Sequence, residues 1–428
     1  MACIGARGDR RIRIGRTVSD DLLRFCLVST FYPPHNFGGD GIAVRRLAMA
    51  LAERGHHVEV VHCVDSFNVL RGDVAADDEY TDHPSIVHHP LHSKFGALSP
   101  LITQQTAHPG LKSKQLRRVL TDGRFDVVHF HNASLIGPTA LGYTDAITLY
   151  TMHEHWLVCP MHVLWRYNRD PCDGKECIRC QLHGRRPPQL WRYTGTLDRA
   201  LKHVDAFIAP STFTRDKHRE FGLNVDAPIV HIPNFIPAPL WTPSGERPPH
   251  ASPYFLFVGR LERIKGAHTL IDAFGTYSSA DLIVAGAGHD EVALRERASG
   301  SPHIKFLGQV PYEQIEQLMR HALAVIVPSV GFEVFPTTVL EANAHGTPVI
   351  GHRLGPLPEM LDGKGGLTYS TQAELIAAME SIRTDPNRRK TLGARGRDVY
   401  QAEWTAEKHM ERYFALIDDL RAHRASSG

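Results

Sequence analysis

The sequence has no apolar run long enough to span a membrane and almost no net charge. No stretch approaches the roughly 18 consecutive apolar residues of a membrane-spanning helix. The basic N-terminus lacks a continuous apolar core and a small-residue cleavage site, so it makes a poor signal peptide. The 48 Lys and Arg residues nearly balance the 46 Asp and Glu residues, leaving a net charge of +2. This balance disfavours nucleic acid as a partner.

Without an export signal, we expect a cytoplasmic protein whose seven cysteines are reduced thiols rather than disulfides. Residues 183–193 combine Arg185, Arg186 and Arg192 with aromatic side chains. This segment could make a peripheral contact with the inner face of a membrane or with an anionic acceptor. It could equally be a solvated loop.

Short apolar runs alternate with helical stretches along the chain. The run 24–30 fits a strand buried on both faces, and it leads through a loop with Gly38 and Gly39 into an amphipathic helix that ends at Gly55. A second strand follows directly. This strand–helix–strand unit predicts a parallel α/β sheet. The second strand is expected at 56–63, and further strands are expected at 125–132, 146–153 and 204–211.

A proline-rich segment at 236–253 has no amphipathic period and is predicted to link two domains. A second series of apolar strands follows it, so we expect two doubly wound parallel sheets with ligands at the carboxyl ends of their strands. The predicted divisions are a flexible arm at 1–23, an N-terminal domain at 24–235, the linker, a C-terminal domain at 254–403, and a helix and tail at 404–428 that could cross back to the first domain.

Two glutamates flank the start of one predicted helix in residues 331–348. Thr338 and Glu341 have the spacing of a capping box, which is a purely structural interpretation. Glu333 precedes the helix and cannot serve that cap, whereas a carboxylate there suits hydrogen bonds from sugar hydroxyls. The helix N-terminus follows a buried strand and favours an anion.

This stretch resembles the E-x7-E motif of retaining glycosyltransferases of the GT-B fold, most closely family 4. Three further segments are similar to that family in the same order: the glycine-rich loop and helix at 37–61, the strand end at 150–155, and the Arg- and Lys-containing segment at 257–274. The resemblance covers about residues 24–420. It implies two Rossmann-like domains that face each other across a cleft.

The resemblance implies a role for each matching residue. Arg260 and Lys265 would stabilise the charge that develops on the departing diphosphate. Glu333 would hold the donor sugar and Glu341 the ribose, while His153 would lie near the reacting centre. The donor site would be completed by Gly38, Gly39, Phe335, Pro336, Thr337 and Thr338.

In this family the mechanism is retaining, and the leaving phosphate helps to deprotonate the acceptor, so no cofactor or catalytic metal is required. The resemblance implies a UDP- or GDP-sugar donor. The acceptor is not readable and could be a saccharide, a lipid-linked precursor or a secondary metabolite. Glu154 departs from the residue usual in the family and could touch the acceptor. A glycosyl-phosphate synthase or phosphorylase, and a non-catalytic nucleotide-sugar or partner-binding protein, remain as alternatives.

Four cysteines crowd into residues 159–180, an insertion relative to an ordinary family member. They are Cys159, Cys172, Cys177 and Cys180. The last three form a C-x4-C-x2-C pattern, and this spacing suits a tetrahedral zinc site. We expect a structural zinc ion there. An iron–sulfur cluster has similar ligand demands, and four unliganded thiols are the third interpretation.

Overall fold

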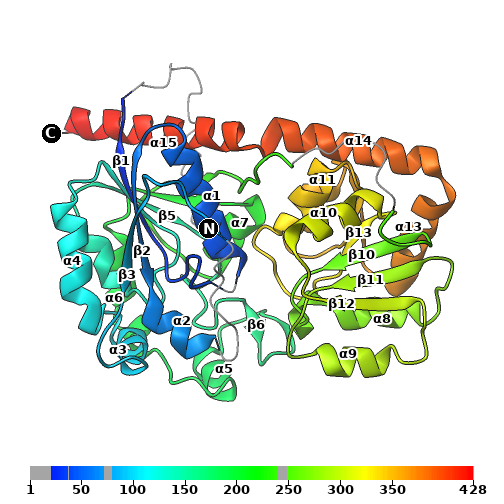
Figure 1. The fold of residues 1–428 in the computed structure, drawn as a ribbon. Helices are drawn as coiled ribbons and strands as arrows, with labels where there is room; N and C mark the ends of the chain where they lie inside the picture. Colours follow the sequence, from blue (N-terminus) through cyan, green and yellow to red (C-terminus); the bar gives the residue numbers. More distant parts are fainter. Residues whose placement is uncertain (1–20, 37, 72–79, 240–247, 428) are drawn as a thin grey trace, which may run out of the picture.

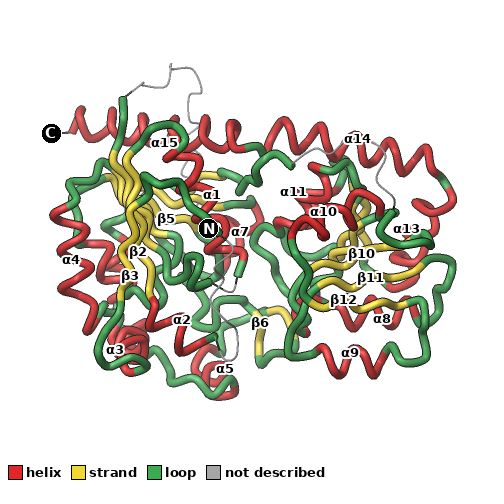
Figure 2. The backbone as a smooth tube through the Cα atoms, viewed as in Figure 1, coloured by secondary structure: helices red, strands yellow, loops and turns green. Residues whose placement is uncertain are grey.

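The computed structural model describes residues 21–36, 38–71, 80–239 and 248–427. Most of the predicted arm at 1–23 and part of the predicted linker therefore lie outside the described residues. Two parallel α/β sheets, each flanked by helices, lie side by side (Figures 1 and 2). This confirms the predicted fold class.

The first sheet has seven parallel strands in the order β3-β2-β1-β4-β5-β8-β9. Its central strand β1 is buried on both faces, because Phe25 and Leu27 pack on one side and Cys26 and Val28 on the other. The strands are β1 (Arg24–Val28), β2 (His57–Cys63), β3 (Val87–Leu91), β4 (Val127–Phe130), β5 (Ile147–Thr151), β8 (Ala206–Ala209) and β9 (Ile229–His231).

The second sheet has six parallel strands in the order β12-β11-β10-β13-β14-β15. In both sheets the strand order reverses beside the first strand, and ligands of doubly wound sheets bind at this point. The strands are β10 (Tyr254–Val258), β11 (Asp281–Ala285), β12 (Ile304–Gly308), β13 (Val325–Val327), β14 (Val349–His352) and β15 (Gly366–Tyr369).

Helices cover both faces of each sheet, as Figure 2 shows in red. Those of the first domain are α1 (Gly39–Ala52), α2 (Val64–Leu70), α3 (Leu98–Thr106), α4 (Ser113–Asp122), α5 (Cys177–His183), α6 (Thr196–Leu201) and α7 (Thr212–Glu220). Those that follow the second domain's first strand are α8 (Ala267–Phe274), α9 (Glu291–Arg297), α10 (Tyr312–His321), α11 (Thr337–Ala344), α12 (Leu357–Leu361), α13 (Gln372–Thr384), α14 (Pro386–Glu403) and α15 (Ala406–Ser427). None of the described helices is long and apolar enough to cross a bilayer.

The last helix, α15, leaves the second domain and packs against the first sheet (Figure 1). Tyr413 and Ile417 are fully buried in the cluster that contains Phe25 and Leu27 of β1. The Tyr413 hydroxyl lies 3.0 Å from His129 Nδ1 of β4. The end of the chain therefore completes the core of the first domain.

Candidate active site

A cleft of about 880 Å³ lies between the two domains at the carboxyl ends of their strands. Both domains contribute to its walls. It is lined by ten of the residues singled out in the sequence: Gly38, Gly39, His153, Arg260, Lys265, Glu333, Phe335, Pro336, Thr337 and Thr338.

Lys265 and Glu333 form the polar centre of the second domain's wall. Lys265 Nζ donates to both carboxylate oxygens of Glu333, at 2.7 and 3.0 Å, and Ser329 Oγ donates to the same carboxylate at 2.6 Å. Burial alone would raise the pKa of Glu333, but the Lys265 ammonium and these hydrogen bonds outweigh it and lower the pKa. Glu333 is therefore a charged, fixed hydrogen-bond acceptor.

The turn that carries Lys265 depends on one glycine. Lys265 ends a short 3₁₀ turn, Arg263–Lys265, and Gly266 follows with φ = 75° before α8 begins. A Cβ on Gly266 would lie 1.9 Å from the carbonyl oxygen of Pro328, so no other residue fits without moving the backbone. This close approach sets Lys265 beside the end of β13.

Arg260 follows β10 and is more open to solvent than Lys265. Its side chain is 56% exposed and pairs with Glu262 at 2.8 Å. Around Gly39, on the opposite wall, the described residues outside its chain neighbours and its own helix backbone place no atom within 4 Å of the position that a Cβ would take. This leaves room on the first-domain side of the cleft for a bound molecule.

The N-terminus of α11 opens into the cleft. The helix begins at Thr337, Pro336 is its N-cap residue, and no side chain caps it. The predicted capping box is therefore wrong: Thr338 lies inside the first turn, and the carboxylate of Glu341 is used elsewhere. A terminus without a side-chain cap leaves helix amides and the positive end of the dipole available to an anion.

Glu341 points toward the first domain instead of lining the cleft. Its Oε1 lies 3.4 Å from Arg46 Nη2 of α1, and both side chains are largely buried. Burial raises the pKa of Glu341, and Arg46 offsets this in part. A ribose bound at Glu341, as predicted, would thus share this carboxylate with Arg46 of the other domain.

His153 stands on the first-domain wall, just after β5. Its Nε2 lies 2.9 Å from Nδ1 of His131, and the two rings stack. Burial, with a smaller contribution from His409, lowers the pKa of His153 to about 3. The imidazole is therefore neutral at pH 7 and acts as a hydrogen-bonding group rather than a cation.

Two family models match the chain over these domains. The model described as Glycosyltransferase Family 4 matches residues 37–238, and the model described as Glycosyl transferases group 1 matches residues 243–399. The chain belongs to the family 4-like glycosyltransferases of the GT-B fold. This confirms the resemblance seen in the sequence and identifies a sugar-transferring enzyme, which removes the support for a non-catalytic binding protein.

Named relatives and a solved structure agree with this assignment. A glycogen synthase of Mycobacterium tuberculosis is 28% identical over 401 residues, covering 89% of this chain and 92% of the relative. An alpha-maltose-1-phosphate synthase of Mycolicibacterium smegmatis is 26% identical, covering 91% and 99%. The Anabaena protein HepE in complex with UDP-glucose has the same fold, with a TM-score of 0.65 at 17% identity over 94% of this chain and 99% of that one.

Two carboxylates of the glycosyltransferase, Asp40 and Glu154, line the first-domain wall of the cleft. Glu154 Oε2 accepts a hydrogen bond from His162 Nδ1 at 2.6 Å, while Oε1 is buried without a partner in the described part of the chain. Burial, and then the charge of Glu154, raises the pKa of Asp40 to about 6. Sequence reasoning missed Asp40, although its place directly after Gly38 and Gly39 was the available signal.

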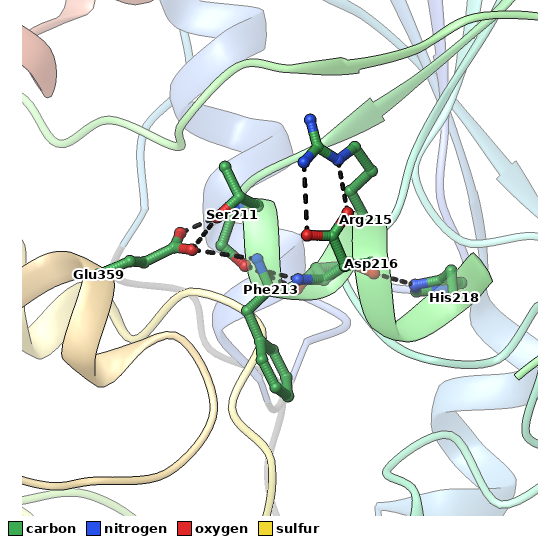
Figure 3. Close-up of polar contacts among 8 residues, drawn as sticks. Ser211, Phe213, Arg215, Asp216, His218 and Glu359 are labelled. Atoms are coloured by element: carbon green, nitrogen blue, oxygen red, sulfur yellow. Dashed lines mark hydrogen bonds and ion pairs between the residues drawn. The ribbon is translucent and has the colours of Figure 1, made fainter. Parts of the chain in front are cut away.

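The two domains of the glycosyltransferase are also joined by polar contacts at the start of α7 (Figure 3). Glu359 of α12 reaches the start of α7, where its carboxylate accepts from the amides of Thr212 and Phe213 at 3.0 Å each. Ser211 Oγ donates to the carbonyl oxygen of Val334 at 2.8 Å. A carboxylate at a helix N-terminus is favourable, so these contacts hold the second domain against α7. Nothing local in the sequence indicates this contact.

Proposed function

We propose that this glycosyltransferase moves a sugar from a nucleotide-diphosphate donor, a UDP- or GDP-sugar, to a hydroxyl group of its acceptor with retention at the anomeric carbon. The observation that carries the proposal is the Lys265–Glu333 pair beside the open N-terminus of α11, facing His153. The cation and the helix amides suit a diphosphate, and the fixed carboxylate suits the hydroxyl groups of a sugar.

On the donor side, Lys265, Arg260 and the amides at Thr337 and Thr338 stabilise the charge that develops on the leaving diphosphate. Glu333, held charged by Lys265, accepts hydrogen bonds from hydroxyls of the transferred sugar. The departing phosphate takes the proton of the attacking hydroxyl, so no protein base is needed. Nucleotide binding would bring the ribose toward Glu341 and compete with Arg46.

On the acceptor side, Asp40 and Glu154 are two carboxylates that orient hydroxyl groups. Both favour a neutral polyhydroxylated end over an anionic one, because like charges repel across a partly buried site. An apolar flank adjoins them, which supports an acceptor with an apolar portion, such as a lipid-linked saccharide. The flank consists of the cleft-lining residues Val69, Leu70, Leu101 and Val163, all at least 40% exposed.

The raised pKa of Asp40 gives this acceptor side a pH signature. The carboxylate becomes a pure hydrogen-bond acceptor only above about pH 6. We therefore expect kcat/KM for the acceptor to rise through about pH 6 in the wild type and to lose this step in Asp40→Asn. An unchanged pH profile in the variant would remove Asp40 from the acceptor site.

A glycosyl-phosphate synthase is the second candidate, favoured by the likeness to an alpha-maltose-1-phosphate synthase. In that reaction the acceptor would carry a phosphate, and two carboxylates at the acceptor side would oppose it. Product analysis with inorganic phosphate or a sugar phosphate as the only acceptor separates the two reactions. Transfer to either compound at a rate above hydrolysis would favour the synthase.

The donor is tested by thermal denaturation of the full chain with UDP, GDP, ADP and their glucose or mannose conjugates. A nucleotide at 100 times its Kd stabilises the folded state by about 2.7 kcal/mol, which raises the Tm measurably. Glu333→Gln should reduce the extra shift given by the sugar conjugate, whereas Glu296→Gln on the exposed face of α9 should not. NMR of the product then assigns the anomeric configuration. Absence of any nucleotide-dependent shift or transfer would refute the proposal.

We also propose a cytoplasmic enzyme that touches anionic membranes through the end of α5 and the segment that follows it. Leu182, Leu190 and Tyr193 are more than half exposed there and lie close in sequence to Arg185 and Arg186. Exposed apolar side chains beside cations suit an anionic lipid surface. The protein should float with phosphatidylglycerol vesicles. Equal flotation with vesicles of phosphatidylcholine alone would contradict a contribution of lipid charge to binding.

A further inference from the structure

The four clustered cysteines surround one small cavity separate from the main cleft. Cys159 follows β5, Cys172 follows the hairpin strand β7 (Asp170–Pro171), and Cys177 and Cys180 lie on α5. The cavity has a volume of about 20 Å³. A site of this size holds about one water-sized sphere, which suits a single ion.

The hairpin beside this cavity is short and has an unusual backbone. The hairpin strands β6 (Trp165–Arg166) and β7 have two residues each, and such a small hairpin is not stable alone. Four non-glycine residues near or within it have positive φ: His162, Leu164, Tyr167 and Asn168, at 75°, 48°, 52° and 56°. Backbone of this kind persists only where the surroundings fix it. The local apolar cluster is small, with Cys159, Leu164 and Phe221 as its buried members.

We propose that Cys159, Cys172, Cys177 and Cys180 bind one Zn²⁺ ion through their sulfur atoms and that this ion fixes the hairpin. In the described part of the chain no three potential ligands are already arranged around a metal position. Binding therefore requires the side chains to move, so that each sulfur comes to about 2.3 Å from the ion. Cys172, whose Sγ contacts the carbonyl oxygen of Gly174 at 3.1 Å, must turn away from it.

The charges around the cavity suit such a site. A zinc ion with four thiolates carries a net charge of −2. The cations Arg192 and Lys175 act electrostatically on Cys177. Arg166 acts on Cys172, although it already pairs with Asp173 at 2.5 Å and lies 3.9 Å from Glu176. These side chains would balance the site without adding a fifth ligand.

The proposed zinc site lies between the two domains, next to the donor wall. Met161 and Trp165 line both the small cavity and the main cleft. Phe332, which directly precedes Glu333, packs on the cluster formed by Cys159 and its neighbours. A Cβ on Gly331 would come within 3.2 Å of the Trp165 ring, which shows how closely the hairpin approaches the segment before Glu333. The ion would thus position one wall of the cleft, a structural role beyond the sugar transfer itself.

The first test is the metal content of the purified full chain, measured by mass spectrometry after growth with zinc or with iron. We expect one zinc per chain, released by a mercurial that titrates thiols. Cys177→Ser with Cys180→Ser should lose the metal, whereas Cys26→Ala, which removes a buried thiol of β1 outside the cavity, should retain it. Metal-free wild-type protein after anaerobic refolding with zinc, or metal retained by the double variant, would overturn the proposal.

A second measurement covers the case in which the double variant does not fold. Wild-type chain loaded with Co²⁺ should show the absorption bands of tetrahedral thiolate coordination. Bands of an oxygen- or nitrogen-coordinated ion would overturn the ligand set, and stoichiometric iron in the zinc-grown protein would overturn the choice of metal. Neither readout depends on transferase activity, so failure here is distinct from failure of the proposed function.

Discussion

Replacing Lys265 by Ala should lower both the stability of the fold and the turnover. Adding Glu333→Gln should restore the first but not the second. The Lys265 and Glu333 side chains are 29% and 17% exposed. Breaking a buried pair costs about 3–5 kcal/mol and a surface pair contributes about 0–1 kcal/mol, so we expect a loss of about 2 kcal/mol at pH 7. For a chain of this length that corresponds to a fall in Tm of about 2 °C.

The stability loss in Lys265→Ala should depend on pH with a definite sign. The pKa of Glu333 is lowered in the folded protein, so the pair stabilises the fold above the ordinary carboxyl pKa, and this stability is lost as pH falls through the lowered value. Without Lys265, burial raises the pKa of Glu333, so the variant gains stability as pH falls through the raised value. The difference between wild type and variant should therefore be largest at pH 7 and shrink below about pH 4.

Turnover should fall by about 10²–10³-fold in Lys265→Ala, the usual effect of losing one group that stabilises transition-state charge. Urea denaturation from pH 4 to 8 and kcat/KM with the donor found by thermal shift measure the two effects. Adding Glu333→Gln should restore much of the stability at pH 7 but none of the activity. Lys305→Ala, on the exposed face of β12, is the matched control. A kcat/KM within about threefold of wild type would remove Lys265 from the diphosphate site, and a pH-independent stability difference would contradict the charge pairing with Glu333.

Three further substitutions test other contacts of the cleft. Glu341→Gln should weaken nucleotide binding about tenfold by calorimetry, while Arg46→Ala should leave it within about twofold; equal losses would mean that Glu341 serves only to join the domains. Glu359→Gln keeps the shape of the contact with α7 but removes its charge, and should lower the Tm by about 2 °C while increasing interdomain motion in small-angle scattering; unchanged values would show that the contact is weak. Gly266→Ala should cost at least about 2 kcal/mol by urea denaturation because its Cβ would lie 1.9 Å from a carbonyl oxygen, whereas Gly39→Ala should not.

Much of the fold could be predicted because most strands are buried on both faces. Runs such as Val325–Val327 are apolar throughout, which is the pattern of a central parallel strand. The edge strand Val87–Leu91 was missed because it carries two histidines and a proline, and only its last residue is buried. The short strands Ile229–His231 and Gly366–Tyr369 were missed for the same reason, since neither is a continuous apolar run.

The site was predictable where its residues follow strands or fit a family motif, and not where it depends on contacts between distant segments. Lys265 and Glu333 were found by motif, but nothing local indicates that they pair. Arg46 and Glu341 are 295 positions apart, so nothing local in the sequence indicates the ion pair that the structure shows. Thr338 was assigned as a cap because spacing alone cannot tell a first-turn residue from the residue before it.

The return of α15 to the first domain means that the chain passes between the domains twice at one place. Ile236, on the outward passage, accepts a hydrogen bond from the Tyr400 hydroxyl at 3.4 Å, and Pro233 accepts one from His409 on the return passage at 2.7 Å. An exchange of donor domains between related enzymes therefore needs two crossover points, one near residue 236 and one near residue 404. A chimera cut only at the first would give the acceptor domain a foreign helix in place of its own, against Phe25 and Leu27 of its central strand.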